Sequence, residues 1–226
     1  MNVKVIVFDL DDTLYNEIDY VKSAFMEVSK YFSDTYRFEK NKFFTLMMEK
    51  LNQNGRGKVF DDTLAHFNIL NKANVKKSIS IYRTHIPNIK LPQASKDIIN
   101  YYTRLAIPLY IVTDGNKLVQ FNKIKGLNIE NSFKKILITH RYGIKNAKPS
   151  VYCFIKIAQL EKVNYSDIVY IGDNIKKDFI AIKKLGFRTI RIKNGMYRNL
   201  VLNKEYHAEI DIQSLQDIQN IITIKE

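Results

Sequence analysis

Five short apolar runs rich in β-branched residues recur along the chain, each bounded by polar or glycine residues. They span residues 3–8, 109–113, 136–139, 168–172 and 188–192. Runs of this length and composition predict buried strands. Helical patterns lie between the later runs, at residues 116–125, 149–160 and 174–185. Strands that alternate with helices predict an α/β fold with a parallel sheet covered on both faces, in which ligands bind at the carboxyl ends of the strands.

Glycine and proline mark the expected ends of these helices. Gly126 and Gly186 should end the first and the third, and Pro149 should begin the second, because proline suits the first helical position and glycine the position after the last.

The interval from residue 16 to residue 95 breaks the alternation. It contains amphipathic patterns such as YVKSAFMEVSKYF and NKFFTLMMEKL, and no convincing strand before residue 107. Apolar residues at helical spacing predict helices. We therefore expect a mostly helical insert after the first strand.

Composition narrows the setting and the partners. Cys153 is the single cysteine of the 226 residues, so no internal disulfide is possible and a reducing compartment is expected. The first apolar run is interrupted by Lys4 and ends at Asp9, too soon for a signal peptide or a membrane span. We expect a cytoplasmic protein without a membrane partner. The formal charge of +13 is spread over nearly every segment. This even distribution argues against a nucleic-acid partner, although the positive charge would help to attract a small anionic substrate.

Polar residues follow several of the predicted strands. Asp9 and Asp11 stand two apart at the end of the first strand, so both can point to one side and offer oxygen ligands to a hard cation such as Mg²⁺. A solvated, negatively charged turn is the alternative. Thr113 ends another strand and leads through Asp114 and Gly115 into a helix. This stretch offers a hydroxyl and backbone N–H groups to an anion, or is an ordinary turn with a helix cap.

Two further motifs complete the set. Lys148 precedes Pro149, where it would bring a positive charge to the strand ends or lie on the surface as most lysines do. Gly172 ends the strand at 168–172 and Asp173 follows it, with Asp178 expected inside the next helix. Asp173 could instead be only the N-cap of that helix.

The ordered combination is more specific than its parts. D-x-D-x-T after a first strand, a strand that ends in threonine, Lys-Pro, and G-D-x-x-x-x-D after a later strand resemble the four motifs of the haloacid dehalogenase (HAD) superfamily. The resemblance covers nearly the whole chain, and the insert resembles the helical cap of the C1 class, subfamily I. It implies a Rossmann-like core of residues 1–15 and 96–226 with a cap domain of residues 16–95.

The resemblance also implies a role for each motif. Asp9 would be the nucleophile and Asp11 the general acid and base. The phosphoryl oxygens would be bound by Thr113, by the N–H groups of Asp114 and Gly115, and by Lys148. Mg²⁺ would be held by Asp9, the carbonyl of Asp11 and Asp173. Supporting roles are implied for Thr13, Asn174 and Asp178.

Asp11 also favours one reaction, because dehalogenases of the superfamily lack this second aspartate. The resemblance implies a Mg²⁺-dependent phosphomonoesterase that hydrolyses a small phosphate ester, such as a sugar phosphate or nucleoside monophosphate, through an aspartyl-phosphate intermediate. A sugar phosphomutase, or a non-catalytic member that binds a phosphorylated ligand, is the alternative. The protein is expected to be a monomer or a homodimer.

Some residues depart from the pattern or lie outside it. Asp114 stands where relatives often have asparagine, and a carboxylate beside a phosphate is unfavourable unless it turns away or meets a cation; it could also contact a substrate group. Asp12 is expected to point away from the metal. Candidate substrate contacts are Tyr15 and Asn16, together with Arg56 and Lys58 in the segment 52–62, which could also be a plain surface connection between helices.

Overall fold

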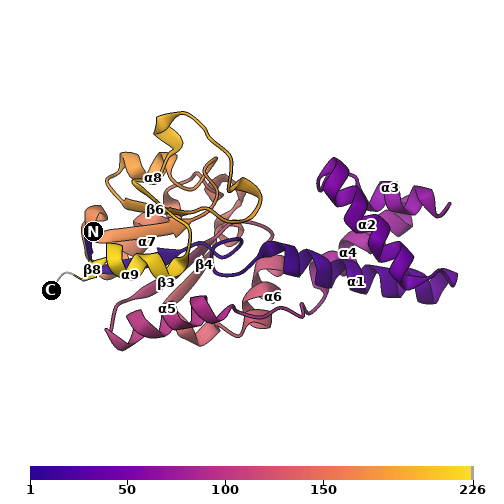
Figure 1. Cartoon of the computed structure of the whole chain (residues 1–226), viewed down its shortest axis with the longest axis horizontal. Coiled ribbons are helices and arrows are strands. Elements are labelled where there is room, and N and C mark those ends of the chain that lie inside the picture. Colours follow the sequence, from indigo (N-terminus) through magenta and orange to yellow (C-terminus); the bar gives the residue numbers. More distant parts are fainter. Residues whose placement is uncertain (225–226) are drawn as a thin grey trace. The chain divides into compact units, whose positions relative to one another are not determined.

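The computed structural model describes residues 1–224, which form two compact units (Figure 1). One unit consists of Met1–Glu17 and the chain from Lys90 onward, and the other of Ile18–Ile89. We expected the chain to divide after residues 15 and 95, and the observed units divide after Glu17 and Ile89. The second division comes earlier than expected because residues 90–92 lead directly into a helix of the first unit.

The first unit is built on a six-stranded sheet in which every neighbouring pair of strands is parallel. The strand order is β4-β3-β2-β5-β6-β7. The bounds are β2 Val5–Phe8, β3 Leu109–Thr113, β4 Lys135–Ile138, β5 Ile168–Gly172, β6 Arg188–Ile192 and β7 Ile210–Ile212. All five predicted apolar runs contribute strands to this sheet, and the α/β, Rossmann-like fold class is confirmed.

The first predicted strand is divided at Lys4. Its start forms β1 (Asn2–Val3), which pairs in parallel with β8 (Thr223–Ile224) in a separate two-stranded sheet. The tail AEIDIQSLQDIQNIITIKE predicts a last strand and a helix. These correspond to β7 and the short α9, and β8 was not predicted. Residues 225 and 226 of that tail lie outside the described residues.

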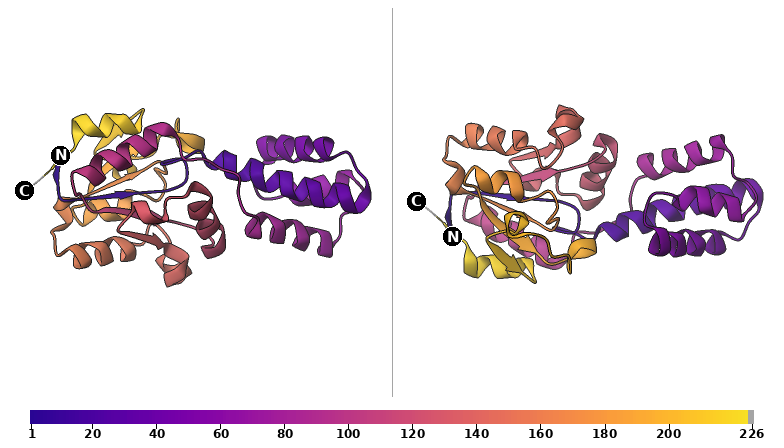
Figure 2. Two further views of the ribbon diagram at one scale, coloured as in Figure 1. Left: turned by 90° about the horizontal axis from the view of Figure 1, so that it is seen from below. Right: turned by 90° about the horizontal axis from the view of Figure 1, so that it is seen from above.

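Helices cover both faces of the main sheet (Figure 2). The helices of this unit are α5 Gln93–Arg104, α6 Lys117–Leu127, α7 Tyr152–Glu161, α8 Ile180–Lys184 and α9 Ile218–Ile221. Helices α5 and α9 lie on one face and α7 on the other. Alternating strand residues such as Val5 and Val7 pack in one buried cluster with Phe154 of α7 and Ile182 of α8, as expected for strands buried on both faces.

The second unit is helical, as the sequence predicts. Its helices are α1 Glu17–Tyr36, α2 Lys40–Asn54, α3 Val59–His66 and α4 Lys72–Thr84, where only the first residue of α1 belongs to the other unit. Their apolar faces enclose a core that includes Phe25, Phe32 and Phe43. Among residues 18–89 the structure contains no strand.

Three predicted helix ends differ from the observed ones. Helix α6 continues through Gly126 and ends at Leu127, and the next residue, Asn128, adopts the left-handed conformation at φ 54°. Helix α7 begins at Tyr152 rather than at Pro149. The predicted helix over 174–185 is reduced to α8, because the side chains of Asn174 and Asp178 bond to nearby backbone N–H groups and form a turn instead. Gly186 does end α8, with φ 93°.

Seven 3-10 helices complete the described secondary structure. They are η1 Glu130–Ser132, η2 Thr139–Tyr142, η3 Ile144–Asn146, η4 Tyr165–Asp167, η5 Gly195–Tyr197, η6 Lys204–Tyr206 and η7 Leu215–Asp217. In residues 1–224, no helix has both the length and the apolar character needed to span a membrane.

The strand order decides which motifs meet. Strand β2 is central, with β3 on one side and β5 on the other. Asp9, Asp114 and Asp173 directly follow the carboxyl ends of these three parallel strands. Neighbouring parallel strands end at the same edge of the sheet, which is where ligands bind in open α/β sheets.

Candidate active site

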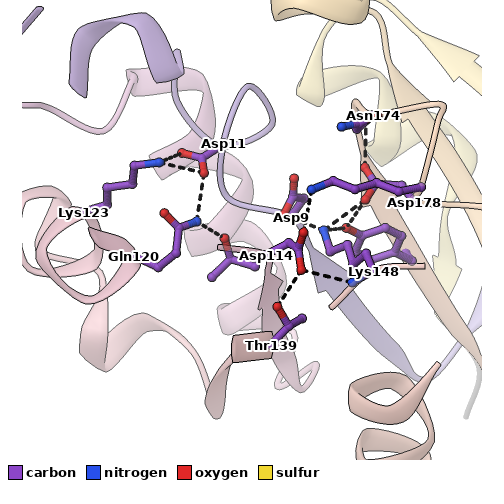
Figure 3. Close-up of polar contacts among 12 residues, drawn as sticks. Asp9, Asp11, Asp114, Gln120, Lys123, Thr139, Lys148, Asn174 and Asp178 are labelled. Carbon is purple, nitrogen blue, oxygen red and sulfur yellow. Dashed lines mark hydrogen bonds and ion pairs between the residues drawn. The ribbon is translucent and has the colours of Figure 1, made fainter. Parts of the chain in front are cut away.

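Asp9 lies at the end of the central strand, in a buried and charged environment. Its backbone N–H donates to the carbonyl of Ile171 on β5 at 2.8 Å, which continues the pairing of the two strands. Its side chain accepts from the ammonium of Lys148 at 2.8 Å (Figure 3). Burial raises the pKa of Asp9, the Lys148 ammonium lowers it, and with the charge of Asp178 the net result is about 7.

Lys148 is the positive centre of this site, and its side chain is only 1% exposed. Its Nζ donates to Asp9 and, at 3.0 Å, to Oδ1 of Asp178. It also donates to the hydroxyl of Tyr170 on β5. Burial alone would lower the pKa of Lys148, but Asp178 and Asp9 raise it above its ordinary value. Lys148 is therefore a fixed cation at the strand ends, and the surface alternative is wrong.

Three buried carboxylates lie together beside this cation. Asp9, Asp173 and Asp178 each offer an oxygen, and these atoms lie within 4.8 Å of one another. Burial, and then the charges of Asp178 and Asp9, raise the pKa of Asp173 to about 9. The cluster thus carries more carboxylate than Lys148 neutralises, and its donors are the hard oxygens that Mg²⁺ prefers. These residues fit a divalent cation.

Asp178 holds the loop after β5 in place. Its Oδ2 accepts from the backbone N–H of Asn174 at 2.9 Å, while its Oδ1 faces Lys148. Gly172 is required here, because a Cβ at this position would lie 2.5 Å from Asp178 Oδ2. Asp178 lies in a turn rather than in the predicted helix, since its side chain is turned back to the start of that turn.

Asp114 is committed to protein partners. Its carboxylate accepts from Thr139 Oγ1 at 2.6 Å, from the backbone N–H of Lys148 at 3.0 Å and from Lys177 Nζ at 2.7 Å. Burial raises the pKa of Asp114, but Lys177 and these hydrogen bonds lower it below its ordinary value. The carboxylate thus meets a cation, which is one of the two conditions expected for it. It also ties the loop after β3 to the loop that carries Lys148.

Thr113 and Gly115 frame the start of α6. Thr113 is fully buried at the end of β3, and its Oγ1 accepts from Nε2 of Gln120. Gly115 has φ 143°, which favours glycine. The side chain of Asn116 accepts from the N–H groups of Leu118 and Val119. These two helix N–H groups are thereby capped, while Thr113 and Gly115 lie before them.

Asp11 is turned toward α6, away from the Asp9 cluster (Figure 3). Both of its oxygens accept from Lys123 Nζ, at 2.7 and 2.8 Å, and Oδ2 also accepts from Gln120 Nε2 at 2.8 Å. The hydroxyl of Tyr15 donates to Oδ1 at 2.7 Å. Gln120 and Lys123 were not predicted from the sequence. Their spacing of three residues indicates only that both lie on one face of the helix that follows Thr113; it does not identify Asp11 as their partner.

Asp12 and Asn16 of the opening loop have hydrogen-bond partners, whereas the Thr13 side chain is buried without one in the described part of the chain. Asp12 adopts φ 52° and its carboxylate accepts from the N–H of Glu17 at 2.8 Å; it is not one of the three carboxylates of the acidic cluster. Thr13 is buried, and its hydroxyl has no hydrogen-bond partner among the described residues. Asn16 accepts from Asn194 at 3.1 Å.

The candidate substrate contacts divide between the two units. Tyr15 is 2% exposed and is occupied by Asp11, so it supports Asp11 rather than presenting a free surface. Arg56 and Lys58 belong to the helical unit and are exposed. Arg56 lines a hollow within that unit together with Phe25 and Tyr82.

The sequence of the chain matches a known protein family. Residues 6–192 match the haloacid dehalogenase-like hydrolases. The chain therefore belongs to this family of enzymes, and the resemblance of its motifs is confirmed.

Individual relatives narrow the comparison. Over 228 residues the chain is 28% identical to a glyceraldehyde 3-phosphate phosphatase of Methanocaldococcus jannaschii, covering 97% of both chains. It is 26% identical to a protein of the same name from Pyrococcus abyssi, covering 97% of this chain and 94% of the other. The names of these relatives agree with the predicted phosphatase class.

Solved structures share the fold. A HAD hydrolase of Bacillus subtilis bound to magnesium superposes with a TM-score of 0.67 at 16% identity, covering 98% of this chain and 99% of the other. A 2-haloacid dehalogenase of Pseudomonas syringae gives 0.64 at 16% identity, covering 97% of each chain. Since hydrolases with different reactions share this fold, the reaction must be argued from the site.

Proposed function

We propose that this protein is a Mg²⁺-dependent phosphomonoesterase that hydrolyses a small sugar phosphate through an aspartyl-phosphate on Asp9. The observation that carries the proposal is the position of Asp9, buried at the end of the central strand, in contact with Lys148 and beside two further carboxylates. The names of the relatives favour a sugar phosphate over a nucleoside monophosphate.

Each residue near Asp9 has a task in this reaction. A carboxylate oxygen of Asp9 attacks phosphorus in line with the ester oxygen, and the bond from phosphorus to that oxygen breaks. Asp11 first takes up a proton, gives it to the departing oxygen, and later takes one from the water that hydrolyses the aspartyl-phosphate. Lys148 and the Thr113 hydroxyl hold the phosphoryl oxygens as negative charge develops.

The acidic cluster supplies the proposed metal site. Asp9 and Asp173 would hold Mg²⁺, with Asp178 fixing the loop of Asp173 and holding Lys148. When bound, Mg²⁺ would neutralise charge on the phosphoryl group and orient it toward Asp9. Lys148 balances part of the cluster's charge without the metal, which keeps Asp9 and Asp178 in place.

The helical unit of residues 18–89 is proposed to be the cap that selects the substrate. Helical insertions of this kind can cover a site and exclude water during the reaction. Arg56 and Lys58 are its proposed substrate contacts, and the proposed substrate is a small-molecule ester in the cytoplasm.

Phosphate release from a panel of esters tests the proposal. The panel contains glyceraldehyde 3-phosphate, hexose phosphates, nucleoside monophosphates and p-nitrophenyl phosphate, each assayed with Mg²⁺ and with a chelator. We expect the chelator to abolish release, and Asp9→Asn to reduce kcat by about 10⁴-fold or more. Asp34→Asn, an exposed substitution of the same kind, should change little.

Two outcomes would contradict the proposal. Activity unchanged by both the chelator and Asp9→Asn would exclude the mechanism. Conversion of a sugar phosphate into an isomer with little free phosphate would identify a phosphomutase instead.

A further inference from the structure

Helix α6 buries two polar side chains that no motif of the family resemblance contains. Gln120 is 1% exposed and Lys123 is 2% exposed. Lysine is almost never fully buried unless it is paired. Both side chains lie on the face of α6 that is turned toward Asp11 (Figure 3).

Lys123 holds Asp11 from the helix side. Its Nζ contacts both carboxylate oxygens of Asp11, and it also donates to Glu17 Oε1 at 3.1 Å. Tyr15 adds a hydrogen bond from the loop side. The Asp11 carboxylate is thereby fixed by donors from two directions, which restricts its rotation.

Gln120 links Asp11 to Thr113. Its Nε2 lies within hydrogen-bond distance of Asp11 Oδ2 and of Thr113 Oγ1. An ionised carboxylate only accepts hydrogen bonds, so the amide nitrogen, and not its oxygen, must face Asp11. The same NH₂ group then uses its second hydrogen on Thr113.

That bond settles the direction of the Thr113 hydroxyl. A hydroxyl has one proton, and because Thr113 Oγ1 accepts from Gln120, its own proton is available to donate elsewhere. Under the proposed function, the group that needs this proton is a phosphoryl oxygen. Gln120 therefore connects the residue that would bind phosphate with the residue that would protonate the leaving group.

We infer that Gln120 and Lys123 are positioning residues that set the Asp11 carboxylate and the Thr113 hydroxyl for transfer of the phosphoryl group. The inference rests on the proposed function and adds a device to it. Neither residue touches the reacting atoms. Lys123 fixes the position of the Asp11 carboxylate, and Gln120 fixes its position relative to the Thr113 hydroxyl.

A purely structural role for the pair predicts a different result from a positioning role. If Lys123 only stabilised the packing of α6, its loss would slow every substrate equally. If it positions Asp11 as an acid, the loss must depend on the leaving group. A nitrophenolate is a stable anion that departs without protonation, whereas the alkoxide of a sugar needs a proton as it leaves.

The test compares kcat/KM for the best alkyl phosphate of the panel with kcat/KM for p-nitrophenyl phosphate. For each ester, kcat/KM reports only the steps up to departure of the leaving group. The later step, in which Asp11 takes a proton from water, therefore does not affect it. For Lys123→Met we expect a loss of about 100-fold or more on the alkyl ester, in the range of acid catalysis, and a much smaller loss on the aryl ester. Gln120→Met should likewise lose more activity on the alkyl ester than on the aryl ester. Because it removes a neutral group, it serves as a second variant if Lys123→Met folds poorly.

Lys125→Met is the matched control, because Lys125 lies on the same helix and is exposed. It should leave both substrates unchanged. Equal losses on both esters in Lys123→Met and Gln120→Met would overturn this inference while leaving the phosphatase proposal standing. A wild-type protein that hydrolyses neither ester would instead overturn the proposed function, and this inference with it.

Discussion

Replacing Lys148 by methionine removes the cation that joins Asp9 to Asp178. The substitution keeps an unbranched side chain of similar length, so the change is mainly one of charge. The Lys148 side chain is 1% exposed and that of Asp178 is 0% exposed. Solvent therefore cannot take over the role of the ammonium without the site opening.

The magnitude follows from the contacts that are lost. Lys148 makes charge-assisted hydrogen bonds of 2.8 Å to Asp9 and 3.0 Å to Asp178. Removing one partner of a buried ion pair costs about 3–5 kcal/mol, because the other charge is left uncompensated. For a chain of this size, a loss of this kind corresponds to a fall in Tm of roughly 6–20 °C.

Thermal and urea unfolding followed by circular dichroism measure the loss, with a chelator present so that no metal compensates for it. Lys145→Met is the control, since Lys145 is an exposed lysine of the same segment. The double variant Lys148→Met with Asp178→Asn separates charge from packing. Asp178→Asn should be less destabilising in the Lys148→Met background than in wild type, because it removes the charge left unpaired.

A loss below about 1 kcal/mol, which is typical of exposed ion pairs, would refute this reasoning. So would strictly additive effects of the two substitutions, because the pair would then not be coupled.

Two further predictions concern the neighbours of this pair. Gly172→Ala would place a Cβ 2.5 Å from Asp178 Oδ2 and should cost about 1–3 kcal/mol by overpacking; Gly57→Ala, whose Cβ would meet nothing within 4 Å, should cost far less, and equal unfolding curves for the two variants would be inconsistent with the crowding. Burial raises the pKa of Asp114, but the Lys177 ammonium and the hydrogen bonds to the carboxylate lower it by more, so the pKa lies below its ordinary value. The stability that wild type has over Asp114→Asn should therefore be complete above about pH 4 and be lost as the pH falls through the lowered pKa. Urea unfolding of both proteins across this range checks it, and a difference independent of pH would be evidence against the ion pair.

The pattern of apolar runs was sufficient to predict the sheet and the helical insert. Strands buried on both faces are nearly continuous in apolar residues, and this signal is local. Helix ends were predicted less well. Gly126 is compatible with the interior of α6, and the chain instead turns at Asn128, because asparagine also adopts the left-handed conformation.

The loop after β5 shows a different limit of local reasoning. Residues 174–185 carry helical spacing, but α8 begins only at Ile180. Asp178 accepts from Lys148, which is 30 residues earlier in the chain, and from the N–H of Asn174. A distant charge therefore favours a turn where the local pattern predicts a helix.

The sequence by itself determined which residue types stand at the ends of three strands, since Asp9, Thr113 and Asp173 each end or directly follow an apolar run. Lys148 was predicted from its place before Pro149. Only the tertiary structure decided the partners of Asp11. Lys123 is 112 positions from Asp11 in the chain and yet contacts both of its oxygens. A contact of this kind depends on how α6 packs beside β3 and the opening loop, and no local pattern encodes that packing.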